Sequence, residues 1–209
     1  MFDLESGKQK LVDRQSVKGR KPTLKEMLSP QVGKQKKSLL LADISGSMHG
    51  AKEFALKAAL AEIWKSHPGL ECVGFADDLF AIEPSDLQAP ESWLGGGTHM
   101  LKALFEAWHR QVAHMVLLTD GQPTDASEER IIQEAQNHKD VPIDTIGLGD
   151  QGVANYHPDF LRMLSHVTGG KFTDVGEPVR LTAVLETLLI EAQRGVLSEG
   201  SQGGGAIRL

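Results

Sequence analysis

The sequence contains a single cysteine, Cys72, among its 209 residues, so no disulfide can form within the chain. Because disulfides are rare where thiols are kept reduced, this count favours a reducing compartment, and we expect a cytoplasmic protein. Cys72 stands in the apolar run Cys72-Val73-Gly74-Phe75, which indicates a buried and unreactive thiol rather than a catalytic one.

Long apolar runs are also missing. No segment approaches the roughly 18 consecutive apolar residues that a membrane-spanning helix needs, so we expect no membrane association. The first residues, 1–5, contain no basic segment followed by an apolar core, and we expect no secretory signal. Hydrophobic residues make up 40% of the sequence and charged residues 24%, which is typical of a soluble protein able to bury a core.

Charge is distributed unevenly along the chain. Residues 1–37 contain ten lysines and arginines and four acids, a net charge of +6, whereas the remaining residues carry 12 basic and 24 acidic side chains, a net charge of −12. A basic arm can bind nucleic acid or an acidic partner, or it can simply be solvated or lie against its own acidic domain. Aromatic side chains do not alternate with these charges as they would in a stacking surface, which favours the second interpretation.

Short apolar segments alternate with amphipathic segments from residue 38 onward. We expect strands at 38–43, 71–76, 79–82, 114–120, 141–148 and 171–175, and helices at 50–66, 100–110, 127–138, 158–168 and 178–193. This alternation predicts a doubly wound α/β fold, with a mostly parallel central sheet and helices on both faces. Asp77-Asp78 lies between two short strands and indicates a hairpin, and hence one antiparallel edge strand.

The chain therefore divides into a basic N-terminal extension, 1–37, one domain, 38–193, and a glycine-rich, flexible C-terminal tail, 194–209. The helix expected after Gly50 has apolar and charged residues interleaved. We assign its apolar face to Phe54, Ala55, Ala58, Ala61 and Trp64, and its charged face to Lys52, Glu53, Lys57 and Lys65.

Oxygen-bearing side chains cluster where two of the expected strands end. The first strand runs into Asp43, with Ser45 and Ser47 following, and a later strand runs into Asp120. A glycine-rich loop delivers Thr98 between them. If the two strands are neighbours in the sheet, these side chains meet at the edge where open α/β sheets bind ligands. Five hard oxygen donors suit an octahedral Mg²⁺ or Mn²⁺, with one position left for water or an incoming ligand.

The combination Asp43-x-Ser45-x-Ser47, Thr98 after glycines, and Thr119-Asp120-Gly121 resembles the metal-ion-dependent adhesion site (MIDAS) of von Willebrand factor type A domains. The resemblance covers roughly residues 38–193 and extends to the segments 146–149 and 161–170, which are similar to those of bacterial members. It implies the doubly wound fold, direct coordination through Ser45, Ser47 and Thr98, and water-mediated or ligand-dependent coordination through Asp43 and Asp120.

The resemblance also implies protein binding rather than catalysis. A partner's Asp or Glu would complete the metal shell, and bacterial relatives often serve AAA+ ATPases of the MoxR type, which makes an adaptor role the leading expectation. Paired acids that would build a second adjacent metal site are missing, because Met48-His49-Gly50 follows Ser47.

Other functions remain open. A phosphatase-like hydrolase could use Asp43 and Asp120 around Mg²⁺, but the sequence offers no second aspartate two residues after Asp43 and no lysine clearly linked to the site. A nucleic-acid-associated module would instead use the basic arm. His49 and His99 adjoin two of the predicted ligands and either face solvent or form a softer metal site.

Two further motifs have competing interpretations. The spacing Gly147-x-Gly149-x-x-Gly152 formally matches a dinucleotide fingerprint, but a turn at the end of a strand explains it better. Trp93, at the end of a long loop, is either a lid residue or an anchor for a partner.

Overall fold

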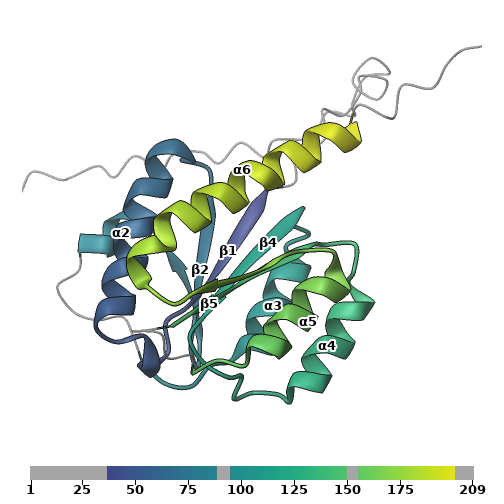
Figure 1. The fold of residues 1–209 in the computed structure, drawn as a ribbon, viewed down its shortest axis with the longest axis horizontal. Helices are drawn as coiled ribbons and strands as arrows, with labels where there is room; N and C mark the ends of the chain where they lie inside the picture. The colour runs from purple at the N-terminus through teal and green to yellow at the C-terminus, as the bar shows by residue number, and fades with distance from the viewer. Residues whose placement is uncertain (1–36, 89–94, 150–154, 201–209) are drawn as a thin grey trace, which may run out of the picture. The chain divides into compact units, whose positions relative to one another are not determined.

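The computed structural model describes residues 37–88, 95–149 and 155–200, with side chains described as far as residue 193 (Figure 1). The basic extension, Trp93, Gly152 and the end of the chain lie outside these residues, so the expectations for them stay predictions, as do the domain boundaries at 37/38 and 193/194. Within the described residues, no helix is both long enough and apolar enough to cross a membrane.

A six-stranded sheet forms the centre of the domain, in the order β3-β2-β1-β4-β5-β6. All neighbouring strands are parallel except β2 and β3, which form an antiparallel hairpin at one edge. The predicted fold class is confirmed, including the antiparallel edge strand. The strands are β1 (Ser38–Asp43), β2 (Glu71–Phe75), β3 (Leu79–Ile82), β4 (His114–Thr119), β5 (Ile143–Leu148) and β6 (Phe172–Val175).

Helices cover both faces of this sheet: α2 and α6 lie on one side and α3, α4 and α5 on the other (Figure 1). The α-helices are α2 (Ala51–Ser66), α3 (Met100–His109), α4 (Glu128–Asn137), α5 (Pro158–Thr168) and α6 (Leu181–Gly200). Short 3₁₀ helices are η1 (Gly46–Met48), η2 (Pro84–Gln88) and η3 (Pro178–Arg180).

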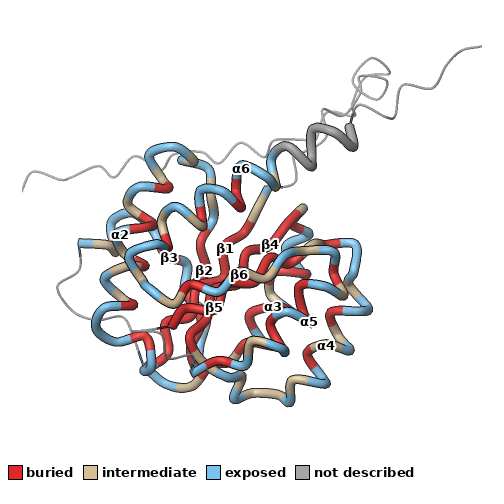
Figure 2. Tube along the Cα trace, viewed as in Figure 1, coloured by how far each residue is buried: buried red, intermediate tan, exposed pale blue. Residues whose placement is uncertain are grey.

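Successive side chains of the central strands pack alternately into the two hydrophobic cores, one on each face of the sheet. In β1, Leu39 and Leu41 pack toward α3, α4 and α5, whereas Leu40 and Ala42 pack toward α2 and α6. Figure 2 accordingly shows the central strands buried and the helices buried mainly where they face the sheet. Buried on both sides, these strands need no polar alternation, which explains their continuous apolar runs. Cys72 is buried as expected, and burial raises the pKa of its thiol far above the ordinary range.

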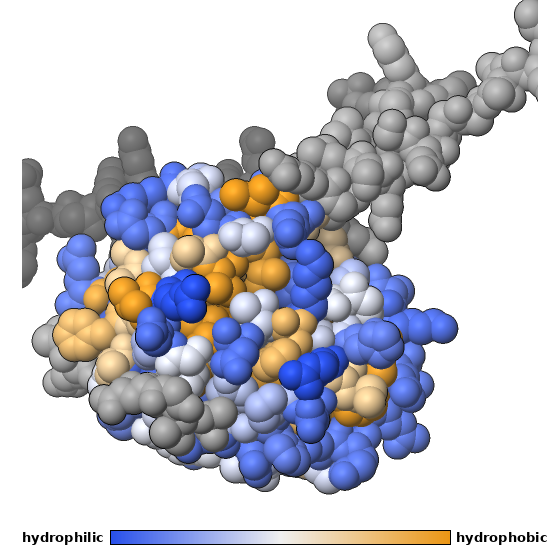
Figure 3. Space-filling view, in the orientation of Figure 1, coloured by the Kyte–Doolittle hydropathy of each residue, from blue (hydrophilic) through white to orange (hydrophobic). Residues whose placement is uncertain are grey.

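The apolar face of α2 differs from our prediction. Its buried residues are Lys52, Leu56, Ala59, Leu60 and Ile63. Of the residues that we predicted, Ala55 and Trp64 are partly buried against the core, whereas Phe54 is 79% exposed. Apolar residues occur on every side of this helix, so the sheet and α6 rather than the sequence pattern select the side that is buried. On the face shown in Figure 3, hydrophobic side chains gather over α2 and α6 among hydrophilic ones.

Two other segments refine the predictions. The helix expected over 178–193 begins as η3 and continues as α6 to Gly200, beyond its expected end at residue 193. Gly195 lies within this helix, where a glycine lowers helix stability by only about 1 kcal/mol relative to alanine. β5 ends at Leu148 and the next described helix, α5, begins at Pro158; residues 150–152 of the glycine motif lie outside the described residues, so the interpretation of that motif stays a prediction.

Candidate metal centre

The turn after β1 holds the Asp43 side chain in place. Asp43 and Ile44 are buried, and Met48, at the end of η1, is fully buried in the core beside them. The backbone amide of Ser45 donates a hydrogen bond of 2.8 Å to Asp43 Oδ1, which is the local bonding typical of aspartate in tight turns. The carboxylate therefore points into the turn that its own sequence creates.

The neighbouring strand β4 holds the other oxygen of the same carboxylate. The register of β1 and β4 pairs Ala42 with Leu118, and the next residues along, Asp43 and Thr119, interact through their side chains. Thr119 Oγ1 donates a hydrogen bond of 2.6 Å to Asp43 Oδ2. We did not identify Thr119 as a site residue from the sequence, although it directly precedes Asp120.

Burial raises the pKa of Asp43 to about 6, against the lowering effect of hydrogen bonds from Ser45 and Thr119, and the nearby charge of Asp120 raises it slightly further. A carboxylate desolvated to this degree lacks the counter-charge that would favour its ionised form. A divalent cation at this position would supply such a charge.

A chain of hydrogen bonds joins the two strand ends. Ser45 Oγ and Ser47 Oγ lie 3.1 Å apart, and Ser47 Oγ donates a hydrogen bond of 2.7 Å to Asp120 Oδ1. Ser45 and Asp120 are buried whereas Ser47 and Gly46 are exposed, so the group opens to solvent at the tip of the turn.

Thr98 joins this group from the glycine-rich loop. Its backbone amide donates to Thr124 Oγ1 and its carbonyl accepts from the Thr124 amide, both at 2.9 Å. A Cβ placed on Gly121 would lie 3.4 Å from Thr98 Oγ1 and 3.6 Å from Ser47 Oγ, so the two hydroxyls flank Gly121 together.

The loop reaches this position because two of its residues are glycines. Gly96 has a φ of 77°, and a Cβ there would lie 2.2 Å from Asp77 Oδ2. Its carbonyl accepts a hydrogen bond of 3.3 Å from the Gly46 amide, and Gly97 donates one of 2.8 Å to Asp77 Oδ1. The loop is thus attached both to the serine turn and to the β2–β3 hairpin.

All five predicted ligands, Asp43, Ser45, Ser47, Thr98 and Asp120, therefore lie at the carboxyl ends of β1 and β4 and the adjoining loop. Their donor set fits a hard divalent cation, because it consists of two carboxylates and three hydroxyls and contains no sulfur or nitrogen. Cation binding by these residues remains a prediction.

The structure adds one residue that we had excluded. Lys52, in the first turn of α2, forms a buried ion pair with Asp120 Oδ2. The expectation that no lysine is linked to the site is therefore wrong, as is the placement of Lys52 on the charged, solvent-facing side of α2. Lys52 shares one side of α2 with the apolar residues Leu56, Ala59, Leu60 and Ile63, which follow it at intervals of four, seven, eight and eleven. This spacing alone does not identify the buried side, because apolar residues also occur on the other sides of the helix.

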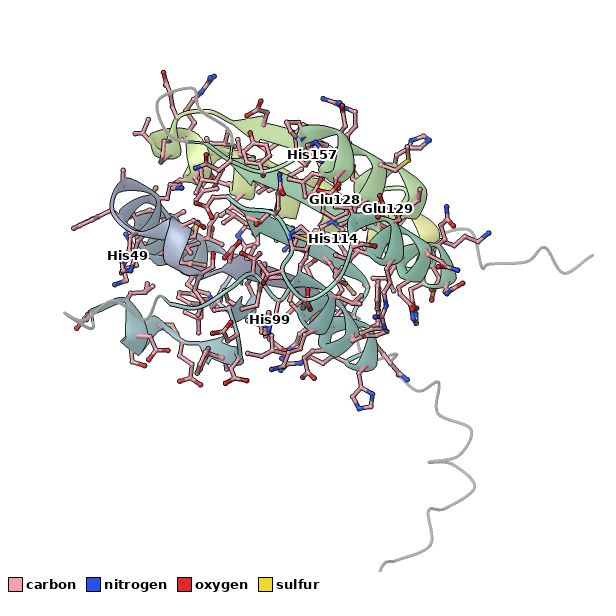
Figure 4. The ribbon with its side chains drawn as sticks, turned by 90° about the horizontal axis from the view of Figure 1, so that it is seen from below. His49, His99, His114, Glu128, Glu129 and His157 are labelled. Carbon is pink, nitrogen blue, oxygen red and sulfur yellow. The ribbon has the colours of Figure 1, made fainter. Side chains whose placement is uncertain are left out.

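The histidines beside the predicted ligands do not form a second metal site. His99 Nδ1 lies 2.9 Å from the Asp77 carbonyl oxygen, and His49 is exposed; Figure 4 shows the two well apart. Across residues 37–88, 95–149 and 155–200, no three side chains of His, Cys, Asp or Glu are arranged to hold a metal ion.

Part of the sequence is similar to a known protein family. The model of the von Willebrand factor type A domain family matches residues 85–174. No curated protein sequence gives a significant match.

Several solved structures share the fold of this chain. The ArnB paralog VWA2 from Sulfolobus acidocaldarius is 21% identical, with a TM-score of 0.59, and the match covers 73% of this chain and 44% of that one. A von Willebrand factor type A protein from Catenulispora acidiphila is 18% identical, with a TM-score of 0.63, and the match covers 75% and 42%.

A third structure, proximal thread matrix protein 1 from the mussel byssus with a zinc-occupied MIDAS motif, is 18% identical, with a TM-score of 0.56. The match covers 75% of this chain and 45% of that protein. The chain thus matches less than half the length of each of these three proteins. The sequence match thus covers residues 85–174, less than half of the chain, and the solved structures show that the chain shares the fold of von Willebrand factor type A domains.

Proposed function

We propose that this domain is a metal-dependent protein-binding module rather than an enzyme. Asp43, Ser45, Ser47, Thr98 and Asp120 would hold Mg²⁺ or Mn²⁺, and an Asp or Glu of a protein partner would occupy the remaining position. One observation carries the proposal: the Ser45–Ser47–Asp120 chain of hydrogen bonds gathers hard oxygen atoms around a turn whose tip is exposed.

Each residue has a distinct part in this proposal. The bonds from Ser45 and Thr119 orient Asp43, whose buried charge favours a nearby cation. Ser47 lies at the exposed tip, where a partner's carboxylate would approach. A bound divalent cation supplies a strong positive centre that accepts one further oxygen ligand. The zinc-occupied MIDAS named for the mussel protein supports divalent binding by a site of this kind.

The same contacts favour binding over hydrolysis. All four oxygens of the two carboxylates already accept hydrogen bonds, from Ser45, Thr119, Ser47 and Lys52. Lys52 is held against Asp120 and is not directed at the exposed tip. Hydrolysis would need a general base within reach of water, and these carboxylates have other partners.

The proposed partner is a protein in a larger assembly, and the resemblance to bacterial relatives suggests a MoxR-type AAA+ ATPase. Recruitment of nucleic acid would depend on residues 1–37, which lie outside the described residues. The binding proposal itself does not depend on that extension.

The test is capture of partners from the native cell extract, with the full chain as bait and Mg²⁺ or EDTA in the buffer. We expect specific partners with Mg²⁺, their loss with EDTA, and their loss with Asp43→Ala. The matched control is Asp159→Ala, which removes an exposed aspartate that pairs with Arg162 on α5. Equal capture by Asp43→Ala and the wild type would refute the proposal.

A further inference from the structure

Lys52 lies in an environment that is unfavourable for a lysine. Its side chain is 7% exposed, and it projects from the first turn of α2, where the helix dipole disfavours positive charge. Lysine is almost never buried to this degree without a partner. Its partner is Asp120, whose side chain is fully buried and whose other oxygen accepts the hydrogen bond from Ser47.

This pair changes the charge of the candidate metal centre. Asp43 and Asp120 alone would balance a divalent cation, and the three hydroxyl ligands add no charge. With Lys52 in contact with Asp120, the same cation leaves the group with a net charge of +1. One carboxylate from outside then restores neutrality. Charges that are removed from water need to be balanced closely, because the low-dielectric surroundings screen them poorly.

We propose, on the basis of the binding function above, that Lys52 couples the cation to its carboxylate ligand. The buried ammonium group weakens cation binding while the sixth position holds only water, and a carboxylate at that position offsets the excess charge. Cation and carboxylate therefore bind tightly only together. By thermodynamic linkage each raises the affinity of the other by the same factor.

A purely structural role for Lys52 would have different consequences. If Lys52 only stabilised Asp120 in the metal-free protein, its removal would lower stability without changing how acetate affects cation binding. The coupling role predicts that removing its charge strengthens cation binding and abolishes the effect of the carboxylate. The two roles thus predict different effects of acetate on cation affinity, which can be measured without an identified partner.

The experiment measures Mn²⁺ affinity of the full chain by calorimetry and by the electron paramagnetic resonance of free Mn²⁺. Sodium acetate serves as the carboxylate probe and sodium chloride as the ionic-strength control. In the wild type we expect acetate to tighten Mn²⁺ binding at least about 5-fold, within the usual range of coupling between sites. Absence of this effect in the wild type would overturn the proposal without any variant.

Three variants complete the test. Lys52→Met removes one buried positive charge and should therefore bind Mn²⁺ at least about 10-fold more tightly than the wild type without acetate. Acetate should change that affinity less than about 2-fold, because no excess positive charge is left for it to offset. Lys52→Arg keeps the charge and should behave like the wild type. Lys65→Met is the matched control, because Lys65 lies at the other end of α2 and pairs with Glu62 at the surface.

The outcomes separate this inference from the binding function. If Mn²⁺ binds the wild type but not Asp43→Ala, and Lys52→Met binds it no more tightly than the wild type, only the coupling role fails. If the wild type binds no Mn²⁺, the metal centre itself fails. Because Lys52→Met leaves Asp120 unpaired, the rise in melting temperature with Mn²⁺ is a second readout, and we expect a larger rise than in the wild type.

Discussion

Ser47 Oγ donates a hydrogen bond of 2.7 Å to Asp120 Oδ1, across 73 positions of the sequence. This bond joins the turn after β1 to the end of β4 and so connects the two halves of the candidate metal centre. On its other oxygen Asp120 contacts Lys52, so one carboxylate links the serine turn, β4 and the first turn of α2. Substitutions here should therefore affect the fold as well as binding.

The Asp120→Asn substitution should destabilise the metal-free domain by about 3 kcal/mol, because it leaves a buried ammonium group without its counter-charge. The measurement is urea unfolding in EDTA. Asp159→Asn is the control and should change stability by less than about 1 kcal/mol, since the ion pair of Asp159 with Arg162 is exposed. A loss below about 1 kcal/mol for Asp120→Asn would show that the buried pair is not a strong structural contact.

The observed buried face of α2 can be tested with a pair of neighbouring residues. Leu56→Ala should cost about 2–5 kcal/mol, because it leaves a cavity under a fully buried side chain. Phe54→Ala should change stability by no more than about 0.5 kcal/mol, because Phe54 is mostly exposed. Chemical denaturation of both variants measures the difference. The reverse order of effects would support the face that we predicted from sequence.

Gly170 has no space for a side chain. A Cβ there would lie 2.1 Å from the carbonyl oxygen of Ile143, a backbone atom of β5 that cannot move independently of the sheet. Gly170→Ala should therefore destabilise the domain by about 2 kcal/mol. Gly176→Ala is the control, because nothing lies within 4 Å of its Cβ position, and its unfolding midpoint should stay at or slightly above that of the wild type. Equal midpoints for the two variants would contradict this packing.

His157 provides a prediction of pH dependence. Its Nδ1 lies 3.0 Å from Glu128 Oε2, and Figure 4 shows the two side chains together. The hydrogen bond and charge of Glu128 raise the pKa of His157 above its usual value of about 6.5. Because the folded-state pKa is the higher one, the stabilisation is complete below about pH 6.5 and disappears as the pH rises through the folded-state pKa.

Titration of the His157 ring by NMR checks this prediction. Glu128→Gln should return the pKa to the ordinary range, whereas Glu129→Gln, at the next position of α4, should leave it raised. Titration of wild-type His157 at or below the ordinary value would contradict the ion pair.

Much of the fold could be predicted because its signals are local. Apolar runs of strand length, amphipathic segments and glycine or proline at their ends each depend on a few neighbouring residues, and they placed every strand of the sheet. The condition that we set for the site, that the strands ending in Asp43 and Asp120 are neighbours, is met, because β1 pairs with β4 in the centre of the sheet. The approach of the serine turn to Asp120 follows from that pairing, whereas Thr98 is brought to the site by the glycine-rich loop.

The features that we missed depend on contacts between distant segments. The burial of Lys52 requires Asp120, which is 68 positions away, and nothing near Lys52 in the sequence indicates this partner. The buried side of α2 is likewise selected by the sheet and α6, because apolar residues such as the exposed Phe54 also occur outside that side. Thr119 acts on Asp43 only because β1 and β4 are adjacent.

The central claim is that Asp43, Ser45, Ser47, Thr98 and Asp120 hold a divalent cation with one position left for a carboxylate. Calorimetric titration of the full chain with Mn²⁺, in the wild type, Asp43→Ala and the control Asp159→Ala, tests it most directly. We predict one Mn²⁺ per chain in the wild type and in Asp159→Ala, and no binding in folded Asp43→Ala. Undiminished Mn²⁺ binding by Asp43→Ala would contradict the account.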